Sequence, residues 1–178
     1  MKRIKIITGG IGSGKSYVCE KLRKRGIEVY DCDAAAKRIM REDPDVRQQL
    51  INLIGEEAYT GNELNKAAVA KFLLQSEYNT QAINAIVHPA VAADFLASDY
   101  EWMESAIYYE ADFGNVLKQV SSEPISPYVI CVSAPTKVRI RRIMKRDNIT
   151  EEKALEWINK QIPQEEKERR SDFVIHNA

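Results

Sequence analysis

The feature that most constrains the fold is a glycine-rich loop close to the N-terminus. It reads Gly9-Gly10-Ile11-Gly12-Ser13-Gly14-Lys15-Ser16 and matches the pattern G-x-x-x-x-G-K-[ST]. The apolar run 4–8 precedes it directly, and residues 17–25 follow with a helical pattern that Gly26 is expected to end. The loop therefore predicts a buried strand that leads into a tight turn and then into a helix.

The loop also has the chemistry of a phosphate-binding site. Its glycines let backbone N–H groups approach oxygen atoms closely. These N–H groups and the N-terminus of the following helix both favour the binding of an anion. Lys15 is expected to reach the β- and γ-phosphates of a nucleotide, and the Ser16 hydroxyl to bind Mg²⁺. The alternative is a glycine-rich turn without a ligand, but glycines, lysine, serine, strand and helix all agree. The sequence therefore predicts a nucleoside triphosphate site.

Composition narrows the class of protein further. The 178 residues suffice for one α/β domain, and the 26 basic and 26 acidic residues balance. This balance argues against a broad electrostatic contact with nucleic acid or an anionic membrane. No stretch of the sequence is long and apolar enough to span a bilayer, and the three cysteines lack metal-binding spacing. We therefore expect a cytoplasmic protein with reduced thiols.

Apolar runs alternate with helical patterns along the chain, which is typical of a parallel sheet. The candidate strands are 3–8, 27–30, 103–109, 128–133 and 172–176. The predicted fold is α/β, with five parallel strands flanked by helices. The C-terminal ends of these strands would line one edge of the sheet, where open α/β sheets bind ligands.

Two helical regions interrupt the strand pattern. Residues 34–96 show helical spacing without a clear strand, and a turn-rich break at 55–62 divides them. Residues 135–170 form the second region, in which Pro135 suits a first helical position and Thr150 suits an N-cap. We expect a core of about 1–33, 97–134 and 171–178, a helical insertion at about 34–96, and a small helical segment at about 135–170.

Two aspartates close the second predicted strand. Asp31 and Asp33 are two residues apart, so in an extended chain both side chains face the same side, at the edge that carries the phosphate loop. Either carboxylate is suited to accept or orient a hydroxyl proton during phosphoryl transfer. The alternative is that Asp33 caps a helix starting at Ala34, and the two roles are not exclusive.

Arginines recur in the second helical region. Arg139, Arg142 and Arg146 follow the spacing i, i+3 and i+7 and share one helix face. They form either a solvated face or a lid that neutralises charge on the transferring phosphoryl group. A nucleic-acid patch is disfavoured because many glutamates follow. Four acidic residues flank the third strand: Glu101, Glu104, Glu110 and Asp112. One of them could contact a second metal or the substrate, but their spacing does not indicate which one.

His88 precedes Pro89, and this pair is typical of a helix boundary, because a residue before proline avoids the helical region. A lone histidine at such a break is more often structural than catalytic. From the residues alone, the structural interpretation is favoured.

Six segments, in order, resemble the bacterial dephospho-CoA kinases, the family that completes coenzyme A synthesis. The phosphate loop with the preceding Thr8 matches that family's loop nearly letter for letter. The other segments are Asp31 to Lys37, Ile83 to Pro89, Arg142 to Asp147, Gln161 to Pro163 and Ser171 to Asn177. The loop alone is diagnostic of nucleotide binding; the order and spacing of all six segments indicate the family.

The resemblance implies a P-loop kinase that moves the γ-phosphate of ATP to the ribose 3′-hydroxyl of dephospho-CoA, with Mg²⁺ as cofactor. It implies that the insertion binds the CoA precursor and that residues 135–170 form a lid. The implied catalytic residues are Lys15, Asp33 and Arg142. The implied ATP contacts are Gly10, Ile11, Gly12, Ser13, Gly14, Lys15, Ser16, Arg146, Gln161 and Pro163, and the implied acceptor contacts are Asp31, Asp33 and His88.

The sequence departs from the family pattern at three points. Residues 105–110 read Ser-Ala-Ile-Tyr-Tyr-Glu where the family has an apolar-Pro-Leu-Leu-Phe-Glu segment, and Cys32 replaces the commoner alanine. The chain also ends at Ala178, where relatives usually add a helix, so apolar surface is expected near the last strand. The alternative function is another P-loop kinase, for a nucleoside, nucleotide or sugar acid. The sequence leaves the oligomeric state open.

Overall fold

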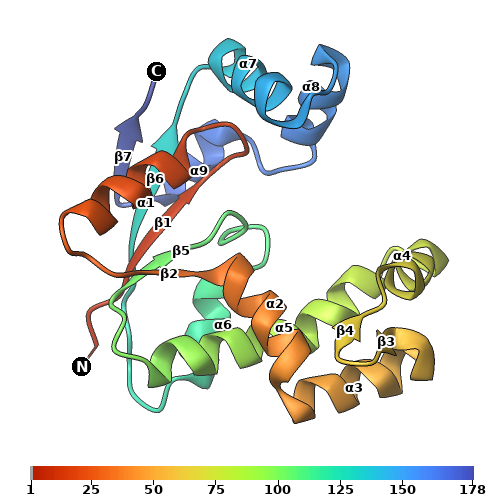
Figure 1. The fold of residues 1–178 in the computed structure, drawn as a ribbon. Helices are drawn as coiled ribbons and strands as arrows, with labels where there is room; N and C mark the ends of the chain where they lie inside the picture. The colour runs from red at the N-terminus through yellow and green to blue at the C-terminus, as the bar shows by residue number, and fades with distance from the viewer. Residues whose placement is uncertain (1) are drawn as a thin grey trace.

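Five strands form one parallel sheet, in the order β2-β5-β1-β6-β7. Their bounds in this computed structural model, which describes residues 2–178, are β1 (Lys5–Gly9), β2 (Val29–Asp31), β5 (Trp102–Glu104), β6 (Tyr128–Ser133) and β7 (Phe173–His176). The predicted α/β fold with five parallel strands is therefore confirmed. Figure 1 shows the sheet with helices on both faces, and its strands run toward the end of the molecule where the C-terminus lies.

The two faces of the sheet are covered by different helices because alternate strand residues point to opposite sides. On β1, Ile6 packs into a large core with α5 (Asn79–Ala97) and α6 (Phe113–Val120), whereas Ile7 packs with Cys19 of α1 (Lys15–Lys24). Both isoleucines are buried. This burial fixes β1 in the middle of the sheet and the loop that follows it at the sheet edge.

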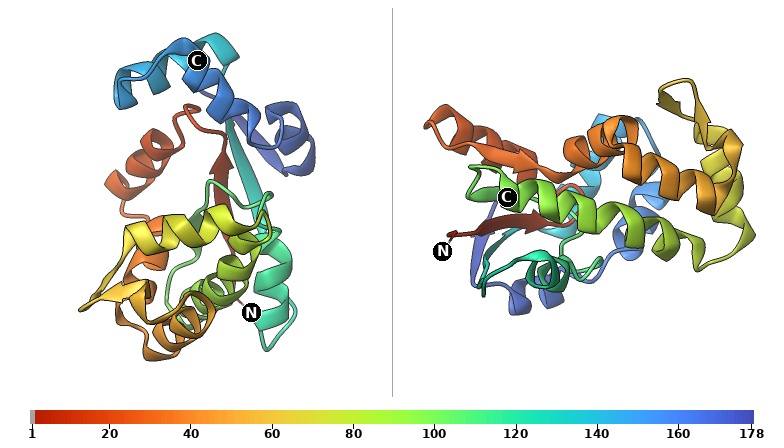
Figure 2. Two further views of the ribbon diagram at one scale, coloured as in Figure 1. Left: turned by 90° about the vertical axis from the view of Figure 1, so that its right-hand side faces the viewer. Right: turned by 90° about the horizontal axis from the view of Figure 1, so that it is seen from below.

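The insertion after β2 is a bundle of helices that projects to one side of the sheet (Figures 1 and 2). It contains α2 (Cys32–Glu42), α3 (Pro44–Ile54), α4 (Lys66–Gln75) and α5, with the short 3₁₀ turn η1 (Glu56–Ala58). Side-chain caps explain the starts of α3 and α4: Asp43 accepts from the Asp45 and Val46 N–H groups, and Asn65 accepts from those of Ala67 and Ala68.

The remaining helices are α7 (Thr136–Asp147), α8 (Glu151–Asn159) and α9 (Gln164–Arg170). The pair α7 and α8 lies beyond the C-terminal end of the sheet (Figure 1). Thr150 caps α8 by accepting the Lys153 N–H at 3.2 Å, as predicted. Pro135 is the N-cap residue of α7, one position before the first helical position that the sequence predicted for it.

Three predictions about element boundaries are wrong. His88 and Pro89 lie inside α5, because the burial of Val87, Val91 and Phe95 along this helix offsets the hydrogen bond that the proline removes. The insertion, for which the sequence predicted no clear strand, also contains a small hairpin of β3 (Tyr59–Thr60) and β4 (Glu63–Leu64) at the end of the turn-rich break.

The third strand is the other difference, since β5 ends at Glu104 and not at Tyr109. The chain turns over 106–112, where Ala111 N–H donates to the Ile107 carbonyl at 2.8 Å. Tyr108 is 6% exposed and packs in the large core, so its apolar character reflects burial in a turn. Within residues 2–178, no helix has the length and apolar character needed to cross a membrane.

Candidate active site

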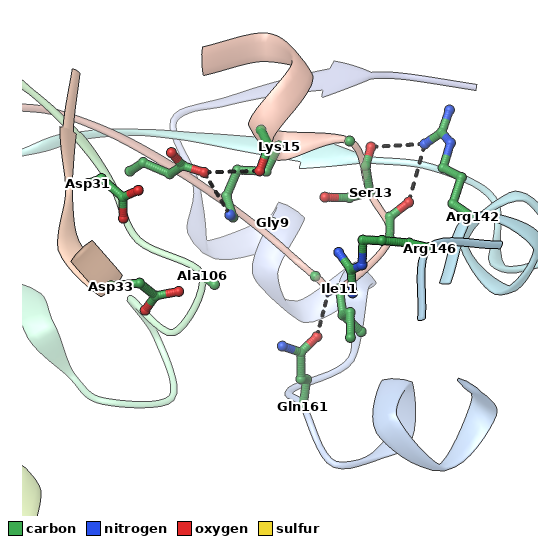
Figure 3. A pocket seen from close by; sticks show the side chains of 15 residues that line it. Gly9, Ile11, Ser13, Lys15, Asp31, Asp33, Ala106, Arg142, Arg146 and Gln161 are labelled. Atoms are coloured by element: carbon green, nitrogen blue, oxygen red, sulfur yellow. Dashed lines mark hydrogen bonds and ion pairs between the residues drawn. The ribbon is translucent and has the colours of Figure 1, made fainter. Parts of the chain in front are cut away.

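The C-terminal ends of β1, β2 and β5 line a pocket of about 440 Å³. Most of the residues predicted from the sequence line it: Gly10, Ile11, Gly12, Ser13, Gly14, Lys15, Ser16, Asp31, Asp33, Arg142, Arg146 and Gln161. Figure 3 shows Asp31 and Asp33 on one side and Arg142 and Arg146 on the other, with Lys15 and Ile11 between them. The structure therefore brings an acidic wall and a basic wall together around the phosphate loop.

The loop needs glycine at the position where it turns into α1. Gly14 has a φ of 89°, a left-handed conformation that favours glycine, and it is the N-cap of α1. A Cβ at Gly14 would also collide with the side-chain amide of Asn177, which donates to the Ser13 carbonyl at 3.2 Å. The segment after β7 thus contacts the phosphate loop, a feature that no local sequence signal indicates.

The ammonium group of Lys15 is paired with a carboxylate from β5. Its Nζ lies 3.1 Å from Glu104 Oε1, and the Ser16 hydroxyl donates to the same oxygen at 3.3 Å. Arg23 Nη2 lies 3.6 Å from Glu104 Oε2. The Glu104 side chain is only 11% exposed, so this carboxylate is nearly enclosed by its cationic partners.

Glu104 was one of four acidic residues among which sequence spacing could not choose. The sheet brings Glu104 to the phosphate loop, because β5 pairs with β1 and aligns Glu104 with Ile7. Glu104 and Ser16 supply two oxygen ligands of the hard type that Mg²⁺ prefers. Residues 2–178 contain no group of three or more His, Cys, Asp or Glu arranged to hold a metal by itself. The pair suits a metal that takes its other ligands from phosphates and water.

Asp31 and Asp33 have separate structural roles. Asp31 caps α2 by accepting the Ala34 N–H at 3.1 Å, so the capping role considered for Asp33 belongs to Asp31. Asp33 lies in the first turn of α2, and the side-by-side arrangement expected for an extended chain is wrong. Both residues still line the pocket, and among residues 2–178 the Asp33 carboxylate has no hydrogen-bond partner. It is therefore available to a ligand.

The α7 arginines are not one solvated face. Arg139 is 3% exposed, its Nε donates to the Ile11 carbonyl at 3.0 Å, and burial lowers its pKa. Arg142 donates to the carbonyls of Gly12, Ser13 and Asn177 at 3.3, 3.1 and 2.8 Å. Arg146 is largely exposed, and it pairs with Asp147 at 2.7 Å. Helix α7 therefore contacts the phosphate loop through Arg139 and Arg142.

Gln161 completes the support of the loop. Its Oε1 accepts the Ile11 N–H at 2.8 Å (Figure 3). Together, Arg139 and Gln161 therefore bind both backbone polar groups of Ile11. Ile11 lines the pocket, and its N–H is bound by Gln161. Pro163 is the N-cap residue of α9 and lines a smaller neighbouring cavity with Gln161.

His88 lies away from these residues. Its ring meets Phe113 of α6 edge to face, with centroids 5.9 Å apart, and burial lowers its pKa. It is not among the residues that line the pocket. Its neighbourhood indicates packing between α5 and α6.

The cysteines near the pocket remain protonated thiols. Burial and the adjacent Asp33 and Asp31 carboxylates raise the pKa of Cys32, and burial with the Glu104 charge raises the pKa of Cys19 to about 12. Cys131 is buried as well, and all three are free. A covalent thiol intermediate is therefore disfavoured, since the thiolate is the nucleophilic form.

Comparison with known proteins agrees with this geometry. Residues 4–178 match a family model described as dephospho-CoA kinase. The dephospho-CoA kinase of Bacteroides fragilis (strain YCH46) is 37% identical in an alignment 178 residues long. The alignment covers 96% of this chain and 82% of that protein.

Solved structures share the fold. The crystal structure of TT1252 from Thermus thermophilus superposes with a TM-score of 0.78 at 30% identity and covers 100% of this chain and 90% of that one. A dephospho-CoA kinase from Campylobacter jejuni gives a TM-score of 0.66 at 20% identity, with 100% and 89% covered, which supports the fold. The phosphate loop, the parallel sheet and the near full-length family match lead to one conclusion: the chain belongs to the dephospho-CoA kinase family.

Proposed function

We propose that the pocket transfers the γ-phosphate of ATP to the ribose 3′-hydroxyl of dephospho-CoA and so produces CoA. The observation that carries this proposal is the meeting of a phosphate loop and a free aspartate, Asp33, in one cavity. The loop is suited to hold the donor, and the carboxylate is suited to receive the acceptor hydroxyl. Family membership identifies the acceptor.

On the donor side, Lys15 is held ready by Glu104 and needs only a short movement to reach the β- and γ-phosphates. Gly12 to Ser16 supply N–H groups at the start of α1, where the helix dipole also favours an anion. Mg²⁺, which a kinase of this fold uses, would be held by Ser16 and Glu104 and would supply positive charge to the phosphate oxygens. Arg139 and Gln161 keep the loop in shape by binding both polar groups of Ile11.

On the acceptor side, Asp33 orients the 3′-hydroxyl and accepts its proton as the hydroxyl oxygen bonds to the γ-phosphorus. The bond from that phosphorus to the β–γ bridging oxygen breaks, and ADP leaves. Asp31 caps α2 and so fixes the first turn that carries Asp33. The acceptor-side role of His88, which the family resemblance implies, stays a prediction.

Helix α7 supplies the lid. Arg142 contacts two loop carbonyls and lines the pocket, so its guanidinium is at hand for the phosphate chain of a bound nucleotide. Its planar fork matches two phosphate oxygens, which a point charge cannot do. Arg146 is the second lid cation, and Pro163 fixes the start of α9 behind the ATP site. The loop contacts of Arg142 support this assignment, because they keep the side chain at the pocket.

The three parts of the chain then divide the work: residues 1–33, 97–134 and 171–178 bind ATP, residues 34–96 bind the acceptor, and residues 135–170 close over the phosphates. The protein works in the cytoplasm, in keeping with its free thiols. Another small-molecule kinase activity is the alternative. The deciding experiment is incubation with MgATP and dephospho-CoA followed by mass analysis: CoA should form, and Asp33→Asn should abolish its formation. No CoA from the folded wild-type protein would refute the proposal.

A further inference from the structure

Helix α9 carries a fully buried lysine next to one wall of the phosphate pocket. The Lys167 side chain has no exposed surface, and its Nζ lies 2.8 Å from Glu110 Oε2. The same Nζ lies 3.5 Å from the carbonyl oxygen of Ala106, a residue that lines the pocket (Figure 3). A buried charge is costly unless it is paired. Lys167 therefore joins α9 to the turn over 106–112.

The glutamate of this ion pair has a second contact, on the connection between α8 and α9. Glu110 Oε2 also accepts the N–H of Ile162 at 3.2 Å. Ile162 lies within residues 160–163, which join the two helices. The Glu110 side chain is 21% exposed, so much of the carboxylate is enclosed by these partners. One carboxylate oxygen thus holds both the buried ammonium of α9 and the backbone of the connection.

The residue before Ile162 is Gln161, which supports the phosphate loop. Gln161 Oε1 accepts the Ile11 N–H at 2.8 Å. The Ile162 N–H and the Cα of Gln161 belong to one planar peptide unit, so the bond to Glu110 restrains the backbone that carries the Gln161 side chain. The contacts form a continuous path from Lys167 through Glu110, Ile162 and Gln161 to Ile11.

Stability alone is a weak explanation for this ion pair. The cost of removing two charges from water offsets much of their attraction, and apolar side chains of similar size often replace such a pair without loss. Helix α9 is also attached at its first turn, where the Gln164 side chain exchanges two hydrogen bonds with the Ala134 backbone at 3.1 and 2.9 Å. The contact with Ile162, in contrast, is directed at the connection that supports the phosphate loop.

We propose that Glu110 and Lys167 are positioning residues for the phosphate donor. Lys167 holds the Glu110 carboxylate, the carboxylate holds the Ile162 backbone, and Gln161 is thereby held at the loop. The pair raises the affinity of the loop for MgATP without touching the nucleotide. This inference rests on the part of the proposed function that assigns ATP to the loop, and it does not depend on the identity of the acceptor.

A comparison within one background separates positioning from stability. Lys167→Met removes the buried charge and leaves Glu110 able to accept the Ile162 N–H. Lys167→Met/Glu110→Leu has apolar side chains at both positions and leaves the Ile162 N–H without this acceptor. Lys167→Met/Glu166→Leu is the matched control, because Glu166 pairs with Arg170, whose side chain is 43% exposed.

The readouts are the Kd of MgATP, measured by titration calorimetry without the acceptor, and KM for dephospho-CoA. Thermal unfolding checks that each variant is folded. Lys167→Met/Glu110→Leu should bind MgATP about tenfold more weakly than Lys167→Met, the scale of one hydrogen bond to a charged acceptor. KM for dephospho-CoA should differ less than about twofold between them, and the Glu166→Leu control should match Lys167→Met.

The same comparison in a Gln161→Ala background tests the path. There, Glu110→Leu should change the Kd of MgATP less than about twofold, because the side chain through which Glu110 acts is absent. A purely structural role of Glu110 predicts the same loss in both backgrounds. A tenfold loss in both would therefore overturn the positioning role.

Three other results decide between the proposals. Equal Kd values for Lys167→Met and Lys167→Met/Glu110→Leu would overturn the inference, and so would equal losses for MgATP and dephospho-CoA, which indicate a general defect. If the double variant does not fold, Glu110→Asp replaces it, since it keeps the charge and shortens the side chain by one methylene group. Weaker MgATP binding by Glu110→Asp supports the inference, and the wild-type Kd overturns it. A wild-type protein that binds MgATP but makes no CoA would refute the proposed function and leave this inference standing.

Discussion

Replacement of Glu104 by glutamine is the perturbation whose effect the structure defines best. The carboxylate faces Lys15 Nζ at 3.1 Å and Arg23 Nη2 at 3.6 Å, and its side chain is 11% exposed. The attraction between unit charges 3.1 Å apart is about 5 kcal/mol at an effective dielectric constant of 20. The cost of removing both groups from water offsets much of it, and the glutamine oxygen still accepts a hydrogen bond. We therefore expect a net loss of about 1–2 kcal/mol.

Two assays read this change. Thermal unfolding of Glu104→Gln should show a Tm lower by roughly 2–8 °C, given about 2–4 °C per kcal/mol for a chain of this size. The Mg²⁺ concentration for half-maximal activity should rise, and kcat should fall by about 10²-fold, the scale of losing one electrostatic group at a transferring phosphoryl group. Glu101→Gln is the control, because Glu101 is 54% exposed and pairs with Lys5 on the outside of the sheet. A Glu104→Gln enzyme with wild-type kcat and Mg²⁺ requirement would refute the role of this carboxylate.

Substitutions at four further residues test individual side chains. Lys15→Ala should lower kcat by about 10²–10³-fold without unfolding the protein, and activity within a few-fold of wild type excludes its role. Asp33→Asn should keep Tm, because Asp31 and not Asp33 caps α2, and should lose phosphoryl transfer; a fall in Tm with activity retained contradicts this. Arg142→Lys should cut kcat with little change in KM for ATP, and Arg142→Ala should cut it more; a loss confined to KM argues against a transition-state role. His88→Ala should raise KM for dephospho-CoA more than KM for ATP, whereas equal effects would assign His88 to the α5–α6 packing.

The sequence predicted the parts of the fold that local patterns determine. The loop from Gly9 to Ser16 follows β1 and opens α1 as expected, because glycine conformations and strand burial are properties of a short segment. The alternation of apolar runs and helices predicted the parallel sheet for the same reason. The Thr150 cap is equally local.

The parts that the sequence could not predict depend on tertiary contacts. Glu104 reaches Lys15 only because β5 pairs with β1, and Asn177 reaches Ser13 only because β7 ends beside the loop. In the sequence, Arg139 cannot be distinguished from an exposed basic residue, because its burial depends on the contact between α7 and Ile11. The prediction of a helix boundary at Pro89 failed because burial along α5 outweighs the preference of the residue before proline for a non-helical conformation.

The position of the transferred phosphate is the measurement on which the proposed reaction depends. Wild-type protein is incubated with MgATP and dephospho-CoA, the product is isolated, and the coupling of its new phosphomonoester phosphorus to the ribose hydrogens is recorded by NMR. The proposed function, in which Asp33 faces the phosphate loop and family membership identifies the acceptor hydroxyl, predicts one new phosphate coupled to the hydrogen on C3′. Coupling to the hydrogen on C2′, or no phosphorylated product, would contradict it.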